Sequence, residues 1–199
     1  MNLAICAPPE IKDMLQTMEG INCTWAQDAP GLFSQDADAY FYFYPTTPEN
    51  LPPGKIIFIN SVCHTLKDLH APANIIRMNG WNGFVEKEYW ELSGVLDDRV
   101  HEVLQSIGKK AILTQDIAGF ISPGIISLII NEAYFALEEK VSSKKEIDIA
   151  MKLGTNYPYG PFEWAEKIGL KNVCELLETL SKTDERFTVS ALLKKEANR

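Results

Sequence analysis

Positive charge is scarce in this sequence. Its 199 residues include 19 Lys and Arg against 27 Asp and Glu, which gives a formal net charge of −8 at pH 7. A surface with this balance repels nucleic-acid phosphates and anionic lipid headgroups. We therefore expect no nucleic-acid partner and no membrane-surface partner.

Cysteine and histidine are also few, with four and three residues. No two cysteines form a CxxC pair, and no cysteine and histidine set has the spacing of a zinc site, so we expect no metal. The first residues lack the basic segment of a signal peptide, and Pro8-Pro9 interrupt the first apolar run. These patterns are typical of a cytoplasmic protein with reduced thiols, namely Cys6, Cys23, Cys63 and Cys174.

The most apolar stretch, residues 118–137, contains Pro123, Gly124, Asn131 and Glu132. A charged residue at the centre of a bilayer costs about 2.5 kcal/mol or more. The stretch therefore predicts a buried core helix, not a membrane span.

Residues 1–110 alternate short apolar runs with turn residues. Ile56-Ile57-Phe58-Ile59 is typical of a strand that is buried on both faces. Interleaved strands and short helices favour a small, mostly parallel α/β sheet. We expect strands at 3–6, 23–25, 39–44, 55–60 and 75–78, and helices at 11–18 and 97–109.

Residues 111–199 predict an all-helical domain. Ser122 is expected to cap a long central helix that reaches about Val141, and Ser143 and Glu146 form a capping box for the next helix. Gly154 is expected to end that second helix. Pro161 then begins a third helix, which Gly169 ends, and two further helices are expected at 172–181 and 190–197.

Three segments of the second half share their order and spacing with one family. They are Gly119-Phe120-Ile121 with the following apolar helix, Glu146–Gly154, and Tyr157-Pro158-Tyr159-Gly160-Pro161-Phe162-Glu163. Together they resemble the C-terminal domain of 3-hydroxyacyl-CoA dehydrogenases. The resemblance implies a shortened Rossmann-like α/β domain over residues 1–110. Residues 111–199 would then form a helical domain of the 6-phosphogluconate-dehydrogenase-like type.

The family's reaction oxidises a 3-hydroxyacyl-CoA to a 3-ketoacyl-CoA, with hydride transfer to NAD, in fatty-acid metabolism. The resemblance thus implies NAD as cofactor, but family members carry G-x-G-x-x-G after the first strand, where backbone N–H groups bind the pyrophosphate. The equivalent stretch here is Cys6-Ala7-Pro8-Pro9-Glu10, and no glycine precedes Gly20. Proline has no N–H to donate, and Glu10 adds a like charge. We therefore expect no bound dinucleotide.

The family's catalytic histidine takes the hydroxyl proton and is paired with a glutamate. The segment 77–84 resembles the strand and loop of that histidine, with Asn82 at its position. The glutamate would fall near Gly94, with Glu91 close but out of step, and Pro123 replaces a substrate-binding asparagine. Ser61 is the one candidate that matches a substrate-binding serine, although a serine in a turn also satisfies backbone groups.

The three histidines, His64, His70 and His101, are weaker candidates, because a lone histidine usually has a structural role. His64 could reach Ser61 if that loop were helical. Two functions stay open: an NAD-dependent dehydrogenase of the family, or a non-catalytic acyl-CoA-binding or interaction protein that keeps the fold. We expect weakened NAD binding and catalysis, and the family resemblance implies a homodimer formed through residues 111–199.

Overall fold

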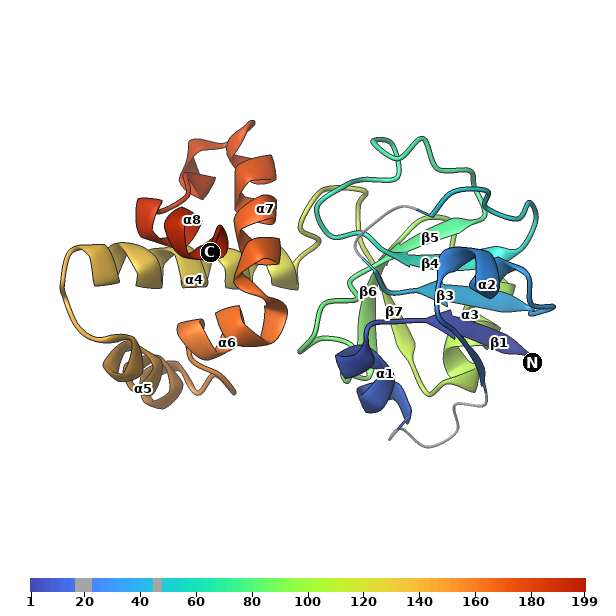
Figure 1. The fold of residues 1–199 in the computed structure, drawn as a ribbon, viewed down its shortest axis with the longest axis horizontal. Helices are drawn as coiled ribbons and strands as arrows, with labels where there is room; N and C mark the ends of the chain where they lie inside the picture. The colour runs from blue at the N-terminus through green and yellow to red at the C-terminus, as the bar shows by residue number, and fades with distance from the viewer. Residues whose placement is uncertain (17–22, 45–47) are drawn as a thin grey trace. The chain divides into compact units, whose positions relative to one another are not determined.

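The computed structural model describes residues 1–16, 23–44 and 48–199. The chain forms two compact units, Met1–Phe120 and Ile121–Arg199, here called the sheet unit and the helical unit (Figure 1). Each unit is described separately below.

The sheet unit contains a seven-stranded sheet in the order β2-β1-β3-β4-β5-β6-β7. Its first five members along this order pair in parallel, β6 is antiparallel to β5, and β7 is parallel to β6. The strands are β1 (Leu3–Cys6), β2 (Cys23–Ala26), β3 (Ala39–Tyr42), β4 (Ile56–Asn60), β5 (Ile75–Met78), β6 (Tyr89–Ser93) and β7 (Lys110–Leu113). The sheet is Rossmann-like and mostly parallel, as the sequence predicts.

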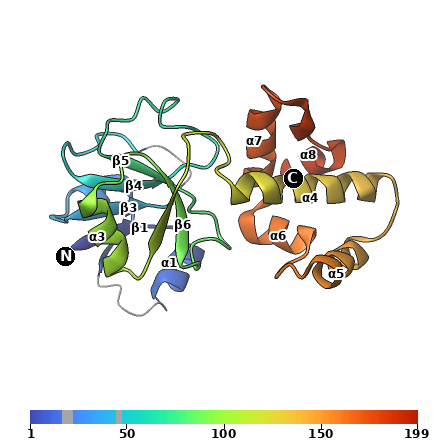
Figure 2. The same ribbon diagram turned by 180° about the vertical axis from the view of Figure 1, so that it is seen from behind.

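Helices cover the two faces of this sheet unequally. On one face, α1 (Pro9–Gln16) and α3 (Asp98–Ser106) bury Leu15 and Leu104 against Phe41 and Phe58. On the other face, the short helix α2 (Ala29–Phe33) contributes Leu32, and loop side chains supply much of the remaining cover. Figures 1 and 2 show α2 and α3 on opposite faces of the sheet.

Most expected strands of the first half are present, but β6, β7 and α2 were not expected from the sequence. The strand β6 carries the buried Glu91, and α2 contains Pro30 and Gly31, which are typical of a turn. The expected end of α1 near Gly20 lies outside the described residues.

The boundary between the units falls after Phe120, later than the expected boundary at 110/111. Lys110–Leu113 is not helical, because it pairs in register with Tyr89–Leu92 as β7. Residues 114–120 also bond to the sheet unit: the N–H of Thr114 donates to Leu92 O, and that of Gly119 donates to Val62 O, both at 2.8 Å.

The helical unit is built around α4 (Ser122–Glu138), which contacts α5, α6, α7 and α8. Ile130 and Asn131 of α4 are fully buried, as expected for a central helix. The surrounding helices are α5 (Lys144–Thr155), α6 (Pro161–Ile168), α7 (Leu170–Ser181) and α8 (Ala191–Ala197), with a 3-10 turn at Glu185–Phe187.

Two expected helix ends are corrected by the structure. Ser122 does not cap α4, because Ile121 holds the N-cap position and no side chain bonds there. Gly154 does not end α5, since the helix continues to Thr155 and Asn156 adopts the left-handed conformation with φ 56°. The capping box of Ser143 and Glu146 is confirmed.

None of the helices in the described part of the chain is long and apolar enough to cross a membrane. All four cysteines are free thiols, and Cys6, Cys63 and Cys174 are buried.

Lys109 is a buried cation between α3 and β7. The residue is 3% exposed, and its Nζ donates to Val85 O and Lys87 O at 2.8 Å each. The ammonium lies 5.2 Å from the ring centroid of Trp90. Burial lowers the pKa of Lys109 to about 8, although the charge of Glu86 opposes this shift.

Because of this lowered pKa, the free energy of unfolding depends on pH in the alkaline range. Between the folded value of about 8 and the unfolded value of 10.5, the unfolded chain holds a proton that the folded protein has released. The free energy of unfolding therefore rises with pH across this window. We expect the wild type to gain up to about 3 kcal/mol relative to Lys109→Met, measured by urea unfolding at several pH values. A difference that stays constant with pH would contradict this expectation.

Candidate functional site

The place where an open parallel sheet binds ligands is set by its strand order. Here β1 lies between β2 and β3, so the chain passes from β1 to the neighbour on one side and then crosses back to the neighbour on the other side. In such sheets the crevice lies at the carboxyl ends of the two central strands. In this chain the corresponding position is at the residues that follow Cys6 in β1 and Tyr42 in β3.

The turn between β1 and α1 uses its own hydrogen-bond donors. Pro9 has no N–H, and the N–H groups of Ile11 and Lys12 both donate to Pro8 O, at 3.1 and 2.9 Å. Glu10 places a carboxylate in the first turn of α1. A phosphate at this helix start would therefore find few donors and a like charge.

Tyr44 lies beside the same turn. Its hydroxyl donates to Ala7 O at 3.4 Å, and its ring lies 5.7 Å from that of Tyr42. Below it, Cys6 is completely buried, and burial raises the pKa of its thiol, with a smaller contribution from Asp28. Aromatic and apolar groups thus line the position where a dinucleotide loop would expose backbone.

The charge of the sheet unit also opposes anionic cofactors. Residues 1–120 contain 15 acidic and 8 basic residues, a net charge of −7, whereas residues 121–199 contain 12 and 11. Nearly all of the chain's net negative charge, −7 of −8, thus belongs to the unit that would bind a dinucleotide.

Asn60 joins the ends of three neighbouring strands. Its side-chain N–H donates to Phe43 O at 2.9 Å, and its Oδ1 accepts from the N–H of Gly80 at 3.1 Å. A Cβ on Gly80 would lie 2.8 Å from the Asn60 side chain, so only glycine fits there. The amide of Asn60 therefore has a structural task at the carboxyl end of β4.

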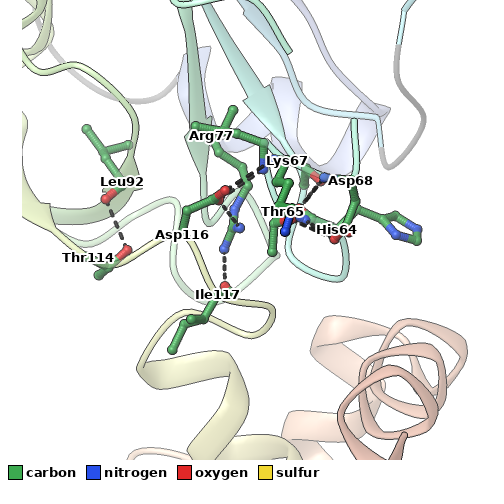
Figure 3. Close-up of polar contacts among 11 residues, drawn as sticks. His64, Thr65, Lys67, Asp68, Arg77, Leu92, Thr114, Asp116 and Ile117 are labelled. Carbon is green, nitrogen blue, oxygen red and sulfur yellow. Dashed lines mark hydrogen bonds and ion pairs between the residues drawn. The ribbon is translucent and has the colours of Figure 1, made fainter. Parts of the chain in front are cut away.

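Ser61, the predicted substrate-binding serine, makes a contact within its own turn. Its hydroxyl donates to His64 O at 2.8 Å. The imidazole of His64 is directed away from the neighbouring Arg77 and Asp116 in Figure 3. His70 has φ 47°, and the Nδ1 of His101 lies 2.8 Å from Asp97 O. In the described parts of the chain, no three metal-ligating side chains gather as a metal site.

The structure brings together Asn79 and Glu91, which differ from the positions expected for the family's histidine and glutamate. Asn79, the first residue after β5, is 3% exposed, and its N–H donates to Glu91 O in β6 at 3.0 Å. Glu91 is 7% exposed. Asn79 precedes Asn82 by three residues, and Glu91 precedes Gly94 by the same offset. Moving both expected positions by the same three residues, from Asn82 to Asn79 and from Gly94 to Glu91, would have identified this pair from the sequence.

The other predicted positions are less suited to chemistry. The Oδ1 of Asn82 is buried and accepts no hydrogen bond from the described residues. Gly94 follows β6 with φ 137°, and a Cβ there would lie 3.0 Å from Ile75 O. Pro123 is in the first turn of α4, in the helical unit. None of these three residues can act as a general base.

Comparison with known sequences finds relatives for the helical unit. Residues 119–198 match the family model for the 3-hydroxyacyl-CoA dehydrogenase C-terminal domain. The chain is 40% identical over 96 residues to the 3-hydroxyadipyl-CoA dehydrogenase of Escherichia coli (47% of this chain). It is 38% identical over 105 residues to the 3-hydroxybutyryl-CoA dehydrogenase of Clostridioides difficile (52% of this chain). The matched regions span only 20% and 37% of those relatives.

Solved structures extend the likeness of fold to both units. The crystal structure of (S)-3-hydroxybutyryl-CoA dehydrogenase from Ralstonia eutropha aligns with a TM-score of 0.69 at 19% identity, covering 98% of this chain and 92% of that one. Mycobacterium tuberculosis FadB2 aligns with a TM-score of 0.70 at 15% identity, covering 88% and 70%. Residues 119–198 therefore resemble the C-terminal domain of the 3-hydroxyacyl-CoA dehydrogenase family, and both units share the fold of the solved dehydrogenases.

Proposed function

We propose that this chain is a family member that has lost or severely weakened NAD binding and dehydrogenase catalysis. The observation that carries the proposal is the turn after β1, where Pro9 lacks an N–H and the donors of Ile11 and Lys12 are taken by Pro8 O. Pyrophosphate recognition requires free donors and close backbone approach at this point. The net charge of −7 on residues 1–120 acts in the same direction.

A second candidate is an active NAD-dependent 3-hydroxyacyl-CoA dehydrogenase. The observation in its favour is the buried Glu91 beside Asn79, which matches the family's glutamate and histidine positions if both are moved by three residues. In that arrangement the glutamate is kept, and an asparagine occupies the position of the catalytic histidine. Asparagine cannot take the hydroxyl proton, so this candidate also requires a base from elsewhere.

Turnover of acetoacetyl-CoA with NADH separates the two candidates. We expect no detectable oxidation of NADH by the wild type. Asn79→His is expected to stay inactive, because it supplies a base while the turn of Pro8 and Pro9 remains closed. The measurement is NADH absorbance at an enzyme concentration on the order of micromolar, so that slow turnover is also detected. Turnover by either protein would show that the dinucleotide binds.

We further propose that the chain keeps an acyl-CoA ligand without acting on it. The family's substrates are acyl-CoA thioesters, and the helical unit, which has nearly balanced charge, carries the family's sequence signature. A saturable rise in melting temperature with acetoacetyl-CoA, but none with NADH, supports this role. No response to either compound would instead leave an interaction protein that keeps only the fold.

We propose a two-fold dimer formed through the helical unit. Five of its large apolar side chains are more than 40% exposed, namely Ile121, Ile125, Val141, Ile149 and Leu153. Exposed apolar side chains of this kind favour a self-complementary interface, and the family resemblance implies that it forms through this unit.

Light scattering tests this assembly. We expect a dimer for the wild type and dissociation to the monomer for the double variant Ile149→Glu and Leu153→Glu, because the charges would be buried at the interface. Lys182→Glu, on the exposed end of α7, is the matched charge control and should remain dimeric. A wild type that is monomeric at micromolar concentration would refute the proposal.

A further inference from the structure

Arg77 of β5 is a fully buried cation with partners from one distant segment. Its side chain is 0% exposed, and its Nη1 donates to Asp116 Oδ1 at 2.7 Å. Its Nη2 donates to Ile117 O, and its guanidinium lies 4.0 Å from the ring centroid of Phe120. The hydrogen-bond acceptors of Arg77 and the ring that lies over it thus come from the segment 116–120, which follows β7.

The carboxylate of Asp116 is bound by backbone groups as well as by Arg77. The N–H of Leu66 donates to its Oδ1 at 2.9 Å, and the N–H of Lys67 donates to its Oδ2 at 3.2 Å. Figure 3 shows the carboxylate of Asp116 between Arg77 and this loop. Successive backbone N–H groups that converge with an arginine form a concave anion-binding site.

The donors of this site are the side chain of Arg77 and two backbone N–H groups of a loop, whereas the anion is a partly exposed side chain. The loop of Leu66 and Lys67 is held by Asp68, which accepts from the N–H and the hydroxyl of Thr65 at 2.9 and 2.7 Å. Arg77 lies within β5. The Asp116 side chain, by contrast, is 30% exposed. The Nε of Arg77 has no hydrogen-bond partner among the described residues, so the donor set exceeds what one aspartate uses.

We propose that Arg77 and the backbone N–H groups of Leu66 and Lys67 form a site for a small oxyanion, a carboxylate or a phosphate group, which Asp116 of the chain itself occupies. An external anion binds there by displacing the Asp116 carboxylate. Binding would therefore free Asp116 from Arg77 and from the loop of Leu66 and Lys67. This site is independent of the turn after β1 and of the proposed loss of NAD binding.

The tether explains why a free anion competes poorly in the wild type. A carboxylate held by its own chain acts at a high effective concentration, so an external anion must exceed it. Removing the carboxylate empties the site and leaves a buried, unneutralised Arg77. An anion that enters this site then stabilises the folded state by mass action.

The test is anion rescue of Asp116→Ala, followed by melting temperature and by isothermal calorimetry. The probes are sodium phosphate and sodium acetate, each compared with sodium chloride at equal ionic strength, so that the two ligand sources are distinguished. At about 100 mM phosphate or acetate we expect a saturable rise of about 5 °C. The wild type should respond with an affinity weaker by about tenfold or more.

Two further variants make the result specific. The double variant Arg77→Met and Asp116→Ala lacks the guanidinium and should show no saturable response, because only the general salt effect remains. Asp116→Asn removes the charge but keeps one acceptor for the loop, so it provides a second protein with an unneutralised Arg77. Equal responses of Asp116→Ala and the double variant, or no response of Asp116→Ala and Asp116→Asn, would overturn the proposal.

Discussion

Asp116→Ala is expected to destabilise the sheet unit by about 3–5 kcal/mol, because it leaves a buried guanidinium without a counter-charge. Arg77 is 0% exposed, and burial lowers its pKa, an effect that the charge and hydrogen bond of Asp116 oppose. The variant also removes the acceptor of the N–H groups of Leu66 and Lys67. Urea unfolding in chloride buffer measures the loss.

The opposite end of the pair should matter less. Asp116 is partly exposed and keeps two backbone donors when Arg77 is replaced, so Arg77→Met is expected to cost about 1–2 kcal/mol. The double variant Arg77→Met and Asp116→Ala should be more stable than Asp116→Ala alone, since it removes the uncompensated charge. Equal costs for the two single variants would show that burial of Arg77 does not dominate this site.

Gly160→Ala is expected to disrupt the contact between α5 and α6, at a cost of about 3 kcal/mol or more. A Cβ on Gly160 would lie 2.3 Å from the Oδ1 of Asp148 and 2.4 Å from its Cβ. That Oδ1 accepts the N–H of Phe162, at the start of α6, at 2.8 Å. The buried Asp148 would have to move away, and the first turn of α6 would lose its acceptor from α5.

A second glycine of the same unit gives a matched control. Gly154 lies inside α5, and a Cβ there meets nothing within 4 Å. Gly154→Ala is therefore expected to stabilise the helical unit by about 0.5–1 kcal/mol, because alanine restricts the unfolded chain and favours helix. Thermal unfolding of both variants decides the point. A loss of stability in Gly154→Ala as large as that in Gly160→Ala would refute the steric explanation.

The parts of the fold that follow from sequence are those with strong local patterns. Ile56-Ile57-Phe58-Ile59 forms β4 with every residue buried, and the capping box of Ser143 and Glu146 begins α5. In contrast, β6 and β7 depend on pairing across the sheet. β6 includes the charged Glu91, and β7 is a four-residue edge strand, so neither has a distinctive apolar pattern.

The candidate site follows the same rule. The sequence Cys6-Ala7-Pro8-Pro9-Glu10 already predicts a turn with few N–H donors, because the missing N–H of proline follows from the residue type alone. The pair of Asn79 and Glu91 could not be identified without the antiparallel pairing of β5 and β6. Arg77 and Asp116 are separated by 39 positions in the chain, and nothing local in either segment indicates that they meet.

The proposed loss of NAD binding is tested most directly by calorimetric titration of NADH into the purified protein. The 3-hydroxyadipyl-CoA dehydrogenase of Escherichia coli, which is similar to this chain, is titrated as the reference protein. We expect no saturable heat up to about 1 mM NADH, since each missing charge-assisted hydrogen bond removes about 1.5–3 kcal/mol of binding free energy. A saturable isotherm with a Kd on the order of micromolar would contradict the closed turn after β1 and would favour an active dehydrogenase.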